Sequence, residues 1–530
     1  IKEIELGTYA EFRKDSVAFQ TYSGFSVLNT LRGNAPNFSI GPNSNPSSIT
    51  LRGAEPTLII DGLPYSQQAD DYFNTNTSEY EYIGIVSSGN ALTTFGTMGS
   101  NGGVYLRSKT GEGYEKPTFE ISSSTSQAWS DRLDLLHDPE TYTQPEFTNS
   151  IAYKQDFGDI DTRVSYTYYY LPDGKGEENI RTNFSALRIN TGFNFTPRFS
   201  ARLLLDDISR EKNFSHYSEF MGTTDLYQSK TKKKNLQGNL SLQYQLLEWF
   251  AVASQISLGE IANDVKSSIS TVTLASDTKE KHSFTNVFLV ANKSFNNELS
   301  LSGFVGIQKE KNKLYQNGSS SEIITNTLLA NASLGIKQYL FIHGNYRRDN
   351  FSTYTDDNTI GNSYSLNTSF VFSELLNWKG GNIGKFRLSF GQTMIGINQG
   401  YPYNWPTTFY GLDYQIHPST KKMVETGFYF SFVEDRLTFS TNYFHNMHYD
   451  ATDVIYISSG GNVATRILAN IWDVKTNGVE FTLTATLIKR NHFSYSSKFI
   501  WGTYNSEWKP AGNFNPPMQY RADDPDWTCG

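Results

Sequence analysis

The chain has 530 residues, a net charge of −8 at neutral pH and 38% hydrophobic residues. Its longest apolar run covers residues 287–291, far short of the ~18 residues that a membrane helix needs, so helical membrane spans are excluded. The acidic balance leaves no concentrated basic face for nucleic acid, and the single cysteine, Cys529, excludes an internal disulfide.

Residues 1–115 form the first region in chain order. They are rich in glycine, with short apolar runs and no long alternation of apolar and polar side chains. This texture is typical of a compact mixed α/β domain, and we expect such a domain at residues 1–115.

From about Pro117 onward, segments of roughly ten residues alternate between apolar and polar side chains, which is the period of a strand with two different faces. One late segment places on a single face Val479, Phe481, Leu483, Ala485 and Leu487. Aromatic residues make up 15% of the chain, which suits the girdles at the two edges of a membrane barrel. We therefore predict a transmembrane antiparallel β-barrel over residues 116–530.

The connections between these segments alternate between short and long. Tight turns are expected at Gly158-Asp159, Thr196-Pro197, Leu247-Glu248, residues 294–297, Lys337-Gln338 and Glu434-Asp435. Long polar loops are expected at residues 209–234, 260–281, 309–325 and 447–475. Short turns at one end and long loops at the other are typical of outer-membrane barrels. The basic cluster at residues 230–234 then lies in a loop, either solvated or in contact with anionic lipid headgroups.

The strand count raises the question of completeness. About 17 strands follow the first domain, the last of them near residues 492–501, and residues 502–530 read as an external loop. A closed single-chain bacterial barrel has an even number of strands, and an open edge in lipid leaves backbone groups unpaired. We therefore expect either that the last strands are missing from this sequence or that the count is off by one.

The first domain also contains a series of motifs whose order and spacing are specific. In chain order these are Leu31-Arg32-Gly33, Leu51-Arg52-Gly53, the stretch from Leu58 to Pro64, Phe95-Gly96, the stretch from Gly99 to Gly102, Lys109 and Gly111. The series resembles the plug motifs of SusC-like (RagA-like) TonB-dependent outer-membrane transporters. Later segments resemble the barrel of the same family, namely Arg348-Asp349 with Phe351-Ser352, residues 387–391, Glu425-Thr426-Gly427 and residues 477–480.

The resemblance implies a barrel of 22 strands in the outer membrane of a Gram-negative, Bacteroidetes-type bacterium, with the first domain as a plug in its lumen. It implies import of oligosaccharides or peptides, with outer-membrane lipid around the barrel, a SusD-like surface lipoprotein over it and TonB pulling on the plug. No TonB box is present at residues 1–7, so coupling requires such a box outside this sequence.

The sequence departs from the family in places that bear on mechanism. Ser87-Ser88 stands where the family usually has Lys-Asp, and Gly103 and Arg107 replace an apolar residue and a threonine. These departures and the missing TonB box motivate an alternative hypothesis. In it the chain is a SusC-like barrel that no longer transports and serves as a structural subunit of a larger outer-membrane complex.

The plug motif has physical reasons of its own. The arginines can hold inward carboxylates of the barrel bidentately, and the glycines suit turns that need positive φ or close backbone approach. For Asp61 two interpretations stay open, an Asx turn before Gly62 and an ion pair between the domains. The motif residues are Arg32, Gly33, Arg52, Gly53, Asp61, Gly62, Gly96, Gly99, Asn101 and Gly102.

Aromatic side chains in the plug and in the long loops are candidate ligand contacts, with simple loop packing as the alternative. They are Tyr65, Tyr72, Phe73, Tyr401, Tyr403 and Trp405.

The sequence predicts no enzyme, no metal site and no cofactor. The glycine run from Gly96 to Gly102 lacks the Lys-Ser/Thr of a phosphate-binding loop. His445 and His448 are three residues apart near a strand end, so their side chains point to opposite faces. The acidic pairs Asp356-Asp357 and Asp523-Asp524 suit solvated loops, or at most weak Ca²⁺ binding.

Overall fold

The computed structural model describes most of the chain. The described residues are 8–13, 27–31, 35–40, 49–65, 72, 75–86, 99, 101–127, 145–171, 178–220, 223–269, 272–295, 298–316, 318–337, 339–352, 360–376, 378, 382–396, 408–409, 412–413, 416–458, 464–490 and 493–512. Among these residues no helix has the length and apolar character needed to cross a membrane.

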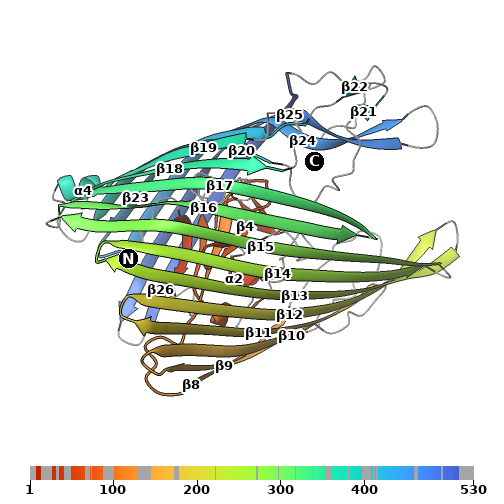
Figure 1. Ribbon diagram of the computed structural model, residues 1–530, viewed down its shortest axis with the longest axis horizontal. Helices are drawn as coiled ribbons and strands as arrows, with labels where there is room; N and C mark the ends of the chain where they lie inside the picture. Colours follow the sequence, from red (N-terminus) through yellow and green to blue (C-terminus); the bar gives the residue numbers. More distant parts are fainter. Residues whose placement is uncertain are drawn as a thin grey trace.

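The N-terminal part folds around a five-stranded sheet with the order β1-β6-β7-β4-β5. Its strands are β1 (Thr8–Arg13), β4 (Thr57–Ile60), β5 (Leu63–Tyr65), β6 (Tyr80–Val86) and β7 (Gly103–Ser108). The small ladder of β2 (Phe38–Ile40) with β3 (Ile49–Leu51), the helix α2 (Val27–Leu31) and the 3₁₀ helix η3 (Thr77–Glu79) accompany the sheet. We call this unit the plug, and it lies inside the ring of long strands (Figure 1).

The β4–β5 hairpin turns on Asp61 and Gly62, which both have positive φ, at 50° and 84°. An Asp-Gly pair with this conformation is the preferred two-residue hairpin turn. The Oδ1 atom of Asp61 accepts a hydrogen bond from the backbone N–H of Ser108 over 2.8 Å. The side chain therefore ties the turn to the end of β7 within the plug.

Seventeen of the described strands form the barrel, in the order β8 to β20 followed by β23 to β26. Their bounds are β8 (Thr118–Gln127), β9 (Pro145–Asp156), β10 (Ile160–Leu171), β11 (Glu178–Thr196), β12 (Phe199–Phe220), β13 (Thr223–Leu247), β14 (Phe250–Ile269), β15 (Val272–Phe295), β16 (Leu299–Gln316), β17 (Ser319–Ile336), β18 (Leu340–Phe351), β19 (Ile360–Phe370), β20 (Ile383–Ile395), β23 (Ser419–Phe432), β24 (Leu437–Ser458), β25 (Ala464–Arg490) and β26 (Phe493–Pro510). The sequence count of 17 is confirmed.

Each barrel strand from β8 to β25 pairs antiparallel with the next barrel strand along the chain. Because the number of strands is odd, β8 and β26, which complete the ring, run in the same direction. Outside the ring, β21 (Thr408–Phe409) pairs with β22 (Leu412–Asp413), and the short helix α4 (Phe372–Leu375) connects β19 to β20.

Burial in the barrel wall is the reverse of burial in a water-soluble sheet. On β10 the polar Arg163, Ser165 and Thr167 are almost fully buried, whereas the alternate residues Val164 and Tyr166 are exposed by 36% and 45%. Other barrel strands, such as β18 and β19, show the same pattern. Polar side chains point to the lumen and apolar ones point outward, so the outer surface suits contact with lipid.

The tight turns lie where the sequence predicts them. Four of them span two to four residues between the strand bounds, and they connect β9 to β10, β11 to β12, β13 to β14 and β23 to β24. The turns after β15 and β17 span three residues each. These turns gather at one end of the barrel, on the left in Figure 1.

The prediction of long loops at the other end is wrong over most of their length. The stretches 209–234, 260–281, 309–325 and 447–475 are the continuing halves of paired strands. The basic cluster at residues 230–234 belongs to β13, where alternate lysines point outward. Likewise, β26 continues to Pro510, so residues 502–510 are strand and not loop. Backbone hydrogen bonds between neighbouring strands stabilise these extensions outside the membrane, where the strands need no apolar face.

Candidate functional site at the plug–barrel interface

Arg52 of the plug binds two glutamates of the barrel wall. Its Nε and Nη2 atoms donate to the two carboxylate oxygens of Glu480 on β25, over 2.8 and 2.9 Å. Its Nη1 and Nη2 atoms also donate to both oxygens of Glu425 on β23, over 3.2 Å each. The guanidinium lies over the ring of Phe444 on β24, 3.9 Å from the ring centre. One plug side chain therefore spans three neighbouring strands.

Further plug residues strengthen this contact. The Nδ2 atom of Asn37 donates to Glu480 Oε1 over 3.0 Å. The Nζ atom of Lys421 on β23 donates to Asn101 Oδ1 over 2.9 Å. Arg52 is only 6% exposed, so its charge depends on these carboxylates for compensation. We call Arg52, Glu425 and Glu480 the arginine clamp.

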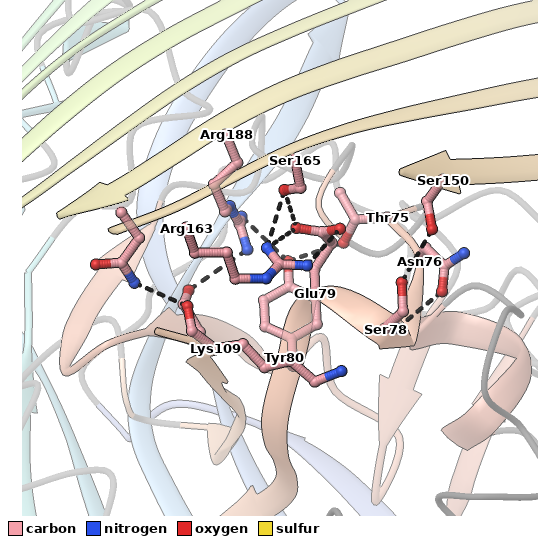
Figure 2. A network of polar contacts seen from close by, with 12 residues as sticks. Thr75, Asn76, Ser78, Glu79, Tyr80, Lys109, Ser150, Arg163, Ser165 and Arg188 are labelled. Carbon is pink, nitrogen blue, oxygen red and sulfur yellow. Dashed lines mark hydrogen bonds and ion pairs between the residues drawn. The ribbon is translucent and has the colours of Figure 1, made fainter. Parts of the chain in front are cut away.

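A second polar network joins η3 of the plug to β10 (Figure 2). Arg163 donates from its Nη1 and Nη2 atoms to Glu79, over 2.6 and 3.1 Å. The hydroxyl of Ser165 donates to the same carboxylate over 2.5 Å. At the adjacent residue, the Ser78 hydroxyl lies 3.2 Å from that of Ser150 on β9. Here the plug supplies the carboxylate and the barrel supplies the arginine, the opposite of the arginine clamp.

The network continues to β11 and β12. Arg188 on β11 pairs with Asp206 on β12, with 2.7 Å between Nε and Oδ1, and donates to the Tyr80 hydroxyl over 3.3 Å. The Tyr72 hydroxyl donates to Asp206 Oδ2 over 2.9 Å. Two plug tyrosines therefore complete an ion pair that belongs to the barrel wall.

Burial and charge shift the protonation of the plug groups. Burial alone would raise the pKa of the Glu79 carboxyl, but the Arg163 guanidinium outweighs it and leaves that pKa below its ordinary value. Burial raises the pKa of the Asp61 carboxyl, and also raises the pKa values of the hydroxyls of Tyr65, Tyr72 and Tyr80. Near neutral pH, Glu79 is therefore a carboxylate and the tyrosines are neutral hydrogen-bonding groups.

One part of the interface is apolar. Four inward side chains of the barrel, on β11, β12, β14 and β15, belong to the same buried cluster as the core of the plug. They are Phe184, Ile208, Ile261 and Phe284. We call them the apolar cradle. The apolar cradle is centred on β13 and the arginine clamp on β24. Around the ring, eight strands separate β13 from β24 on one side and seven on the other, so the two contacts lie opposite each other.

The structure places several of the predicted motif residues at this interface. Arg52 holds barrel carboxylates, and Asn101 contacts Lys421. Gly53 has φ of 80° and lies against the ring of Tyr504 on β26, which leaves no room for a Cβ atom without a shift of that ring. Gly99 and Gly102 close a turn through a backbone hydrogen bond of 3.1 Å. Arg32, Gly33 and Gly96 lie outside the described residues.

The aromatic candidates are placed differently from an open ligand platform. Tyr65 and Tyr72 are 5% and 0% exposed, and their rings meet edge to face. The Tyr65 hydroxyl accepts a hydrogen bond from Asn239 of β13 over 3.0 Å, so both tyrosines join the plug to the wall. Phe73, Tyr401, Tyr403 and Trp405 lie outside the described residues.

Sequence reasoning missed the network around Glu79. Arg163, Arg188 and Asp206 all occupy the inward face of strands whose outward face is apolar, and charges at such positions were the available signal. Among the described residues, no group of three or more His, Cys, Asp and Glu side chains is arranged to hold a metal ion. The contacts of the interface join the plug to the barrel wall.

Comparison with known proteins finds a similarity of fold. No protein-family model and no curated protein matches the chain. Among solved structures, it resembles the RagAB peptide importer in its closed-closed state, with a TM-score of 0.76, 12% identity and coverage of 98% of this chain and 76% of that chain.

Two further structures show the same likeness. The siderophore receptor PirA from Pseudomonas aeruginosa matches with a TM-score of 0.65 and 13% identity, over 92% of this chain and 84% of that one. The outer membrane transporter YddB from Escherichia coli matches with a TM-score of 0.69 and 10% identity, over 92% and 76%. These neighbours are transporters and receptors, and at such identities the likeness concerns the fold. The chain therefore has the fold of the TonB-dependent transporters of the Gram-negative outer membrane, the fold that its SusC-like plug motifs predicted.

Proposed function

We propose that the chain is an energy-coupled importer of oligosaccharides or peptides, closed at rest by its plug and working with a SusD-like surface lipoprotein. The observation that carries this proposal is the arginine clamp, in which one plug residue holds two carboxylates of the wall. An importer must keep its lumen closed at rest and release the plug when it is pulled.

A polar attachment suits such a release. When a buried ion pair is opened to water, solvation of both charges replaces much of what the pair loses, whereas removal of one partner alone leaves a costly unpaired charge. The contacts at Glu79, Asp206 and Asn101 are polar in the same way. The plug has its own apolar core, so it can shift as a unit while these contacts exchange for water.

The likeness to the RagAB peptide importer supports a peptide among the two substrate classes and supports assembly with a second protein. The sequence resemblance supplies the SusD-like lipoprotein and TonB as partners. We therefore propose capture of the substrate at the end with the long strand hairpins, under the lipoprotein, and traction on the plug from the end with the tight turns.

A second candidate function is a structural subunit of a larger outer-membrane complex. It is favoured by Ser87-Ser88, where the related transporters usually have Lys-Asp, because a plug that has lost a charged pair can have lost its response to pulling. In this role the arginine clamp serves only to fill and stiffen the barrel.

Uptake and partner capture separate the two functions. Cells that carry the protein and cells that lack it would be fed labelled mixed oligopeptides or oligosaccharides, with and without collapse of the proton gradient. For an importer, uptake of one class falls on deletion and also on loss of the gradient, and pull-down from outer membranes yields one lipoprotein partner. Unchanged uptake together with many partners would establish the structural role.

A further inference from the structure

The outer face of the barrel carries a pocket of about 480 Å³ across β15, β16, β17 and β18. Its main lining side chains are those that alternation directs outward, and they are exposed, whereas the intervening residues point to the lumen and are buried. The pocket is therefore open to the membrane side and not to the plug. It lies on the opposite face of the barrel wall from the attachment sites described above.

The first row of the pocket is apolar except at one end. Strand register places Val287 beside Ile307, Ile307 beside Leu328, and Leu328 beside Arg348. The three apolar side chains are exposed by 41%, 63% and 45%. Arg348 therefore stands level with a row of side chains that suits acyl chains.

The second row, one pleat further along the strands, is polar. In it Thr285 pairs with Lys309, Lys309 with Asn326, and Asn326 with Asn350. The pocket thus has two cations on adjacent rows, Lys309 on β16 and Arg348 on β18, with β17 between them. Amide groups stand beside them as further hydrogen-bond donors.

The two rows mark the edge of the membrane. On β16 the outward positions from Leu299 to Ile307 are apolar or glycine, and Lys309 is the first charged one. Nine residues are about the length with which a tilted strand crosses the hydrocarbon core. The edge lies toward Gln316, at the end with the long hairpins, which is the outer leaflet in barrels of this kind.

Neither cation of the pocket has a direct partner in the part of the chain that the structure describes. Glu322, which attracts Lys309, pairs directly with Lys311 over 2.9 Å. An arginine at the level of lipid-facing side chains costs free energy unless an anion compensates it. Guanidinium binds phosphate bidentately and ammonium adds a point charge, so phosphate is the anion that this pair fits best.

We propose that this pocket binds a phosphorylated glycolipid of the outer leaflet. Its phosphate lies between Lys309 and Arg348, and one acyl chain lies along Val287, Ile307 and Leu328. The apolar row favours a lipid over free phosphate, because a small anion would make no contact with that row. The site is independent of transport and rests only on the embedding of the barrel in the membrane.

Native mass spectrometry of the full chain in detergent tests the proposal. Delipidated protein would be titrated with bisphosphorylated lipid A, with lipid A from which the phosphates have been removed, and with inorganic phosphate. The variant Lys309→Gln/Arg348→Gln removes the two cations. The matched control Lys489→Gln/Arg490→Gln removes one lysine and one arginine at the other end of the barrel, next to the turn between β25 and β26.

We expect wild type and control to retain phosphorylated lipid A, and the Lys309→Gln/Arg348→Gln variant to bind it about tenfold more weakly or worse, as loss of charge-assisted hydrogen bonds implies. Dephosphorylated lipid should bind to all three proteins with the weak affinity of the variant. Equal binding by wild type and variant, equal binding of both lipids, or displacement of the lipid by millimolar inorganic phosphate would each overturn the proposal. Unchanged β-sheet circular dichroism would verify that the variant is folded.

Discussion

The hydroxyl of Tyr72 donates a hydrogen bond to Asp206 over 2.9 Å, so that a plug residue completes the coordination of a barrel carboxylate. Arg188 of the barrel donates to both oxygens of the same carboxylate. Both Tyr72 and Asp206 are almost fully buried, so neither group can exchange its partner for water while the plug is seated. The contact therefore reports on the position of the plug.

Tyr72→Phe should weaken the attachment of the plug by about 1.5–3 kcal/mol, the usual range for a hydrogen bond to a charged group. The ring and its packing remain, so the loss is that of the hydroxyl alone. Tyr65→Phe is the matched control, because the Tyr65 hydroxyl accepts its hydrogen bond from the neutral Asn239, and the loss of that bond should cost about 1 kcal/mol. Hydrogen exchange of β4 to β6 in the full chain measures the loss of protection in both variants. A loss in Tyr65→Phe equal to or larger than that in Tyr72→Phe would contradict the assigned contact with Asp206.

Arg52→Met should loosen the plug by about 3–5 kcal/mol, because Glu425 and Glu480 stay buried without their counter-ion. Adding Glu425→Gln and Glu480→Gln to the same variant should restore part of this loss, since the unpaired charges are then gone. The susceptibility of the plug to limited proteolysis would be compared in the three proteins. A triple variant more susceptible than Arg52→Met would show that the arginine acts through packing and not through charge.

Gly111→Ala should disturb the junction between the plug and β10. A Cβ atom there would lie 2.2 Å from the backbone oxygen of Thr162, so that strand must shift, at about 1–3 kcal/mol. Gly113 has φ of 78° and open space around it, so Gly113→Ala adds only local backbone strain. Residue-level hydrogen exchange should show faster exchange at β10 for Gly111→Ala alone, and equal exchange in both variants would refute the steric explanation.

The interaction of Glu79 with Arg163 predicts a pH dependence. The pKa of Glu79 lies below its ordinary value of 4.5, so the carboxylate contributes stability above that pH and loses it as pH falls through the lowered pKa. Wild type should therefore exceed Glu79→Gln in protection of β6 at pH 7, and the difference should shrink on acidification below pH 4.5. Because other carboxylates titrate in both proteins, only this difference is diagnostic, and a constant difference down to pH 3 would contradict the ion pair.

The strand pattern and the plug could be predicted from sequence because both depend on local signals. The alternation of apolar and polar residues shows which face of a strand meets lipid. The Asp-Gly pair at residues 61 and 62 by itself predicts a turn with positive φ. The sequence predicts loops at the hairpin extensions because beyond the membrane both strand faces are polar, so the period of two disappears although strand pairing continues.

The partners of Arg52 were harder to foresee than its role. The arginine and its two glutamates are more than 370 residues apart, and only closure of the ring brings β23 and β25 beside the plug. The same holds for Tyr72, which the sequence offers as an aromatic ligand contact and which the fold places against Asp206 of β12. A single sequence shows that a charge needs a partner, but the curvature of the sheet decides which partner it meets.

The apolar cradle and the arginine clamp lie on opposite sides of the plug, and separation costs them different amounts. Parting the cradle exposes hydrocarbon to water at about 25 cal/mol per Å² with nothing gained in return, whereas water entering at the clamp hydrates Arg52 and its glutamates. A pull on the plug is therefore expected to tilt it about β11–β15. In the proposed importer, the first passage would then open along β23–β25, lined by Glu425 and Glu480, which favours a substrate that tolerates a strip of negative charge.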